Sequence, residues 1–175
     1  DTVETFYRVI SPNDSGVDML QMMNLWRQQG LGLDGSDQIK AYAEVDLQNR
    51  AEVKTAIAEF GGVLVGLALP QFAVTGEILK TPWARPWPWW LKVWNPMNLP
   101  NPSNGHCVYL DGYAEDGPNC VTWGEDKAAT WPFISTYGMV GIVPLSEEDW
   151  LSQGKTPAGL DKEALYRYLD VITKD

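Results

Sequence analysis

Apolar positions along the chain repeat with two different periods. In several stretches they recur at the three- and four-residue spacing that predicts an amphipathic helix. Elsewhere they form short apolar runs bounded by glycine, proline or other turn residues, which is typical of strands. The helical stretches are 4–10, 19–29, 49–60 (with Asn49 as its cap), 147–151 and 161–173, with a short helix or turn at 130–137. The predicted strands are 39–45, 63–69, 106–113, 119–123 and 139–145.

One of these strands is apolar throughout. Val63–Leu69 is a continuous apolar run between Gly62 and Pro70, so we expect a strand that is buried on both faces. A helix with the apolar stripe of 49–60 directly before it would supply part of the cover.

The periodicity stops in the segment 70–104. This segment holds seven of the 12 prolines and a cluster of tryptophans, and we interpret it as a long loop or meander. The tryptophans could line a groove, a protein interface or a sugar platform, since tryptophan is enriched at binding hot spots. They could equally pack against the prolines and fix the loop. The candidate binding residues are Trp83, Trp87, Trp89, Trp90 and Trp94.

Composition and charge narrow the possible partners. The 175 residues are enough for one domain with a hydrophobic core. With 23 acidic against 13 basic residues, the net charge of -10 argues against nucleic acid and against anionic membrane surfaces. No apolar run is long enough to cross a membrane, and no signal peptide is visible, which leaves the location open between cytoplasm and virion.

The inventory of reactive residues is small. One histidine and two cysteines cannot build a histidine-rich metal site or a disulfide framework, and no nucleotide-binding or metalloprotease motif is present. We therefore expect no cofactor and no metal. The acidic pairs Glu115/Asp116 and Glu125/Asp126 and the run 147–149 could each supply half of a carboxylate dyad, but solvated surface charges have the same appearance.

Two segments carry a resemblance to a known family. The stretch Asn104–Tyr113, with its Gly-His-x-Val and Gly-Tyr pairs, and the stretch Cys120–Gly124 resemble the histidine strand and the following Ser-Trp-Gly strand of papain-like cysteine peptidases. Residues 41–69 and 13–30 are similar to the family's preceding elements. The Ser-x-x-Asp-Trp-Leu stretch at 146–151 is similar to a bacterial and phage branch.

The resemblance implies an α+β fold with helices packed on an antiparallel, partly barrel-like sheet. It would occupy residues 1–153, followed by a linker and an amphipathic helix at 154–175. It also implies roles for three residues. His106 would be the catalytic base, Trp123 the ring packed beside the site, and Thr122 a residue that orients or contacts the histidine.

The departures from the family pattern concern the chemistry itself. The family's nucleophilic cysteine and the glutamine before it have no counterpart here, and its orienting asparagine aligns with Val121. A base without a nucleophile cannot complete thiol attack. The chain is then the C-terminal portion of a peptidase whose nucleophile lies on a missing segment or another subunit, or a degenerate member. The partner would be a protein or peptide.

Two other classes of function stay open. The chain could be a non-catalytic binding or structural protein, such as a phage virion or assembly component that uses the fold as a scaffold. It could also be a carbohydrate-binding module or glycosidase, given the tryptophans and acidic pairs.

The family alignment also sets a strand register. If His106 faces Val121, then Cys107 faces Cys120 on the adjacent strand. Directly opposed positions are close enough for a disulfide, so we expect the two sulfurs to touch as a bridge or as buried thiols.

Overall fold

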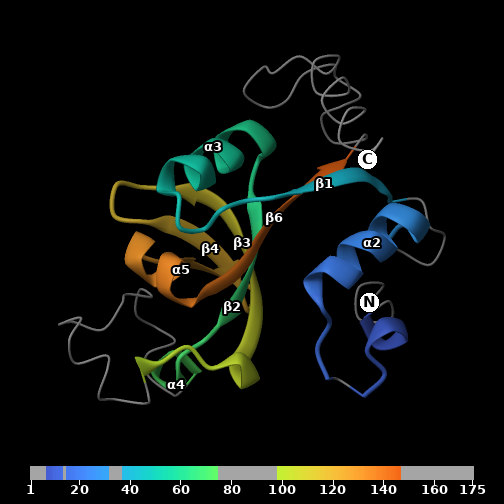
Figure 1. The fold of residues 1–175 in the computed structure, drawn as a ribbon, viewed down its shortest axis with the longest axis horizontal. Coiled ribbons are helices and arrows are strands. Elements are labelled where there is room, and N and C mark those ends of the chain that lie inside the picture. The colour runs from blue at the N-terminus through green and yellow to red at the C-terminus, as the bar shows by residue number, and fades with distance from the viewer. Residues whose placement is uncertain (1–6, 14, 32–36, 75–97, 147–175) are drawn as a thin grey trace. The chain divides into compact units, whose positions relative to one another are not determined.

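The computed structural model describes residues 7–13, 15–31, 37–74 and 98–146 (Figure 1). The chain forms two compact units, Asp1–Ala43 with Pro144–Asp175 and Glu44–Val143. The tryptophan cluster 83–94 and the predicted elements after Ser146 lie outside the described residues, so the division at 153/154 stays a prediction. None of the helices in the described ranges is both long and apolar enough to cross a membrane.

The sheet has six strands and is open. Strand β2 pairs with β3 and β6, and strand β4 pairs with β3 and β5; all four pairs are antiparallel. The predicted α+β class and antiparallel sheet are therefore confirmed, whereas the sheet does not close into a barrel. The strands, in spatial order, are β1 (Ile39–Glu44), β6 (Gly138–Ser146), β2 (Val63–Ala68), β3 (Gly105–Tyr113), β4 (Pro118–Thr122) and β5 (Glu125–Ala128).

The helix α2 (Met19–Gln29) belongs to the first unit and has ordinary caps. Asp18 accepts a hydrogen bond from the backbone N–H of Gln21 at 2.9 Å, which satisfies one of the exposed amides of the first turn. The helix ends at Gly30, whose φ of 77° suits a residue without a side chain. The predicted range is confirmed.

The helix α3 (Arg50–Phe60) in the second unit follows its sequence signals closely. Asn49 caps it through the N–H of Glu52, and the Glu52 carboxylate in turn accepts from the N–H of Asp46. Gly61 ends the helix in the left-handed region at φ 82°. Three residues of the predicted apolar face, Val53, Ala56 and Ile57, are buried, and the fourth, Phe60, is half-buried.

Three further short helical segments lie in the second unit. The segment predicted as a short helix or turn is the helix α5 (Trp131–Tyr137), which Thr130 caps. α4 (Gln71–Val74) and the 3-10 turn η4 (Pro102–Asn104) lie within the segment that the sequence left without structure. Strand β5 was also missed, because its residues are mostly charged and show no alternation.

The core of the second unit is built on β2. Val63, Val65 and Leu67 share one face of this strand and are fully buried, while Leu64 on the other face is only half-buried. Helix α3 contacts both β2 and β3, and α5 contacts β2. The buried-strand prediction therefore holds except at Leu64. Large side chains of the same core are Leu110, Phe133, Ile134 and Tyr137.

The predicted register between β3 and β4 is wrong by three residues. Leu110, not Cys107, lies opposite Cys120, and an irregularity between Leu110 and Gly112 shifts the pairing further along. Side chains alternate between sheet faces, so Cys120 shares a face with Leu110 whereas Cys107 lies on the other face. Both cysteines are free: Cys120 is buried and Cys107 is exposed. The predicted contact between the two thiols is wrong.

Candidate functional site

The candidate site lies where β3 begins and β4 ends. His106 is the second residue of β3 and lies opposite Leu67 of the central strand. Thr122 is the last residue of β4 and is 6% exposed. The imidazole Nε2 of His106 and the Oγ1 of Thr122 share a hydrogen bond of 2.6 Å. The structure thus brings together two of the three residues to which the family resemblance assigned a role.

The third residue, Trp123, lies in the turn that joins β4 to β5. Thr122 pairs with Glu125, so Trp123 and Gly124 form a two-residue hairpin loop. Both have positive φ, 50° for Trp123 and 76° for Gly124, as a type I′ turn requires. The indole stacks on the His106 ring with a centroid distance of 4.3 Å and an angle of 21° between planes. The three predicted residues therefore form one cluster.

Trp123 is an unusual choice for this turn. A bulky side chain in the left-handed region costs roughly 1–2 kcal/mol, and asparagine or glycine is the usual occupant. The side chain is also 54% exposed, so burial of the indole offsets only part of that cost. The left-handed backbone at Trp123 accompanies the stacking of its indole on His106.

The environment favours the neutral form of the histidine. Burial lowers the pKa of His106 below its ordinary value of 6.5. A neutral imidazole has a nitrogen lone pair that can accept a proton, which is the state that a general base needs. The Thr122 hydroxyl can donate or accept, so it can hold Nε2 in either tautomer.

This pKa shift predicts a pH-dependent stability. The unfolded chain binds a proton at His106 near pH 6.5, whereas the folded chain binds it only at lower pH. The unfolded state is therefore favoured by protonation, and the free energy of unfolding decreases as the pH falls below about 6.5. We expect the drop in unfolding free energy between about pH 7 and about pH 5 to be larger for the wild type than for His106→Gln. Urea unfolding of both proteins at the two pH values measures it. An equal drop in both proteins would contradict the shift.

Val121 does not take the place that the family alignment gave it. It lies opposite Tyr109, on the face of the sheet that Thr122 does not share, and is 37% exposed. The expected pairing of His106 with Val121 is therefore wrong. The side chain that meets the imidazole is that of Thr122, one position further along.

Neither of the chain's two thiols is placed to act as the nucleophile of this cluster. Cys107 follows His106 directly, so its side chain lies on the opposite face of the strand. The residue as a whole is exposed, but partial burial of its thiol raises the pKa. Burial, with the Asp111 carboxylate adding to it, raises the pKa of Cys120 to about 12. Both thiols are held in the protonated, poorly nucleophilic form at neutral pH.

The backbone carbonyls of the acidic pair Glu115/Asp116 accept hydrogen bonds that hold the loop between β3 and β4 in place. The backbone carbonyl of Glu115 accepts from the Trp131 indole at 3.0 Å and from Arg50, and the carbonyl of Asp116 accepts from the Trp131 N–H. These contacts tie the loop to α3 and α5. Over the residues that the structure describes, no three His, Cys, Asp or Glu side chains gather in a way that could hold a metal ion.

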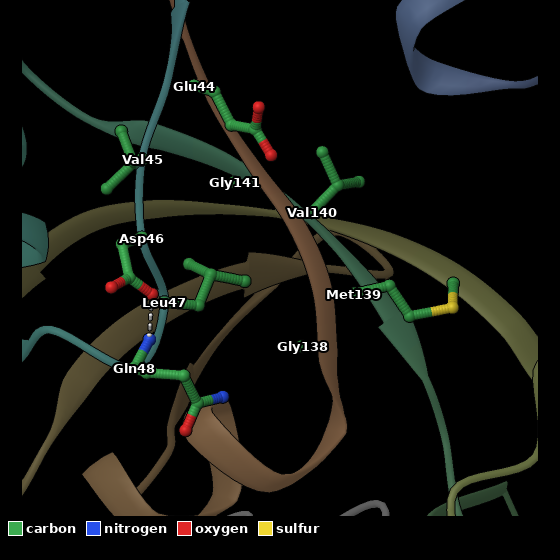
Figure 2. Close-up of a pocket in the computed structure, with 9 residues that line it drawn as sticks. All are labelled: Glu44, Val45, Asp46, Leu47, Gln48, Gly138, Met139, Val140 and Gly141. Atoms are coloured by element: carbon green, nitrogen blue, oxygen red, sulfur yellow. Dashed lines mark hydrogen bonds between the residues drawn. The ribbon is translucent and has the colours of Figure 1, made fainter.

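A shallow pocket, which the sequence analysis missed, lies beside β6 (Figure 2). It has a volume of about 140 Å³ and lies between residues 44–48 and 138–141. Gly138 and Gly141 let the chain at Leu47 approach closely, since a Cβ would lie 2.5 Å and 2.7 Å from its methyl carbons. Glycines within a strand pattern were the available signal. Asp46 is one of the lining residues, and its carboxylate accepts from the N–H of Gln48.

Comparison of the chain with protein-family models, curated proteins and solved structures gives no match.

Proposed function

We propose that this chain is a papain-like cysteine peptidase homologue in which His106 is the general base of peptide-bond hydrolysis. The observation that carries the proposal is the cluster of three side chains, with Thr122 hydrogen-bonded to Nε2 of His106 and the Trp123 indole stacked on its ring. The observed fold is an α+β fold with an antiparallel sheet. That its topology is papain-like is part of the same proposal.

Each residue of the cluster has a distinct task in that reaction. The neutral imidazole takes the proton from a thiol, the thiolate attacks the peptide carbonyl, and the imidazolium gives the proton to the leaving amine. Water, deprotonated by the same imidazole, then cleaves the acyl thioester, releasing the acid and the thiol. Because Thr122 engages Nε2, Nδ1 is the nitrogen that would exchange the proton. Trp123 covers the ring and excludes water from the Nε2 hydrogen bond. Thr122 and Trp123 are positioning residues.

The nucleophile of the proposed reaction comes from outside the given sequence. The two cysteines here have raised pKa values, and Cys107 lies on the wrong face of its strand. A preceding segment of a longer product or another subunit would have to bring a cysteine to His106. The complete gene product, or a partner subunit, must therefore supply a reactive cysteine.

The complete product of the source reading frame provides the test. It should hydrolyse members of a fluorogenic peptide library, and His106→Ala should reduce kcat/KM at least about 100-fold, as expected for a lost general base. Cys107→Ser is the matched control from the same strand and should retain activity. Absence of hydrolysis, or full activity of His106→Ala, would overturn the enzyme proposal.

A non-catalytic binding protein is the second candidate. The raised pKa of both thiols favours it, because it leaves the base without a reactive partner within this chain. A complete gene product with no further cysteine and no hydrolysis would support this alternative. The carbohydrate-binding alternative depends on tryptophans outside the described residues and stays a prediction.

A further inference from the structure

The strand β5 forms one edge of the six-stranded sheet. It pairs with β4 on one side, and no other described strand lies beyond it. Edge strands present a row of backbone N–H and C=O groups to which another extended chain can add.

The register determines the direction of these groups. In a two-residue hairpin, the pair next to the turn is hydrogen-bonded, so Glu125 bonds to Thr122 of β4 and the next residue points its backbone outward. The same alternation makes Ala129 bond inward, and its N–H does donate to the carbonyl of Pro118 at 2.9 Å. The backbone groups of Asp126 and Ala128 therefore point away from β4.

The side chains along this edge leave the backbone accessible and give it a negative charge. Glu125, Asp126 and Ala128 are all exposed, and alanine adds little bulk. The basic residue between them, Lys127, is only 7% exposed. The Lys127 ammonium interacts with the Glu125 carboxylate, so the excess charge at this edge is negative and comes from Asp126. A basic segment is therefore the complementary one.

The aromatic residue of the preceding turn does not belong to this edge. The Trp123 indole stacks on His106 of β3, and β4 lies between β3 and β5. The edge itself combines main-chain donors and acceptors with negative charge within four residues, 125–128.

From this arrangement we propose that the open edge of β5 binds a basic, extended segment of a partner protein as an additional strand. The interaction surface consists of the outward backbone of Asp126 and Ala128 and the Asp126 carboxylate, with Glu125 beside them. This function is independent of peptide hydrolysis, since it uses backbone groups rather than His106.

The probe for the test is a fluorescein-labelled eight-residue peptide of alternating lysine and valine. Its binding is measured by fluorescence anisotropy, and the Asp126 and Ala128 amides are followed by hydrogen exchange. We expect saturable binding and slower exchange at these two amides. Ala128→Pro removes one outward N–H without touching the β4 ladder or the charge, and should weaken binding about tenfold or more. Asp126→Asn should weaken it about two- to fivefold, the range of one exposed ionic contact.

Peptide-side controls keep the test decisive if Ala128→Pro does not fold. The same peptide methylated on alternate backbone nitrogens keeps its charge but cannot pair as a strand, so it should not bind. A glutamate–valine peptide should not bind either. Equal binding of the methylated and unmethylated peptides would show attraction by charge alone and overturn the proposal. No binding of the lysine–valine peptide, or unchanged exchange at the two amides, would also overturn it.

Discussion

Replacing Gly117 with alanine should destabilise the protein by about 3 kcal/mol or more, because the new methyl group has no room. A Cβ at this position would lie 1.7 Å from the backbone oxygen of Ala129 and 2.7 Å from the Cα of Thr130. These are backbone atoms, so relief requires the β3–β4 loop to separate from the start of α5. Chemical denaturation monitored by tryptophan fluorescence measures the loss.

The matched control lies in the same hairpin. A Cβ at Gly112 would meet no heavy atom within 4 Å, and this glycine has no positive φ. Gly112→Ala should therefore change the unfolding free energy by less than about 1 kcal/mol. Similar stabilities for the two variants would contradict the close approach of the loop to α5.

The second large effect is expected in the core of α5. Phe133 is fully buried and its ring lies 4.8 Å from that of Tyr137, whose hydroxyl donates to the carbonyl of Asn98 at 2.8 Å. Phe133→Ala should cost about 3–5 kcal/mol through lost burial and the cavity left behind. It should also loosen the segment that leads from Asn98 to His106. Urea unfolding measures the first effect and hydrogen exchange at the start of β3 the second.

A conservative replacement separates cavity formation from other causes. Phe133→Leu keeps most of the volume and should cost less than about 1.5 kcal/mol. If both variants lost the same free energy, the aromatic contact with Tyr137 rather than the cavity would be the source of the stability. If neither lost any, the packing of α5 described above would be wrong.

The elements that the sequence predicted correctly are those with strong local signals. Helix α3 has an asparagine cap, an apolar stripe and a glycine stop, and the strand β2 is apolar from end to end. Strand β5 has no such signal. Its pairing depends on the Trp123–Gly124 turn and on β4 being in place, so it is a product of tertiary structure rather than of its own residues.

The register error has a definite physical origin. The alignment with the family placed His106 opposite Val121, whereas the hairpin closes with Tyr113 opposite Pro118, which sets a different register. The irregularity between Leu110 and Gly112 changes the pairing by one residue only, and Gly112 within the strand is its signal in the sequence. An odd-numbered shift in pairing moves side chains to the other face, so the expected contact of Cys107 with Cys120 fails and Val121 faces away from His106. Thr122 meets the imidazole because it lies on the correct face at the end of its strand.

The candidate site was predictable only as a set of residue identities. The family resemblance grouped His106, Thr122 and Trp123, but their hydrogen bond and ring stacking depend on the turn geometry at 123–124. The pocket beside β6 and the open edge of β5 depend on which strands become neighbours, which a single sequence does not state.

The turn at Trp123 has a consequence for finding sites in chains without recognisable relatives. A designer who fitted every residue to its local backbone would place asparagine before Gly124, and in doing so would remove the indole from His106. The left-handed backbone at position 123 favours asparagine or glycine, whereas stacking on His106 requires an aromatic ring. A residue that scores poorly against its own backbone, yet contacts a titratable group, therefore marks a place to look for function without any alignment.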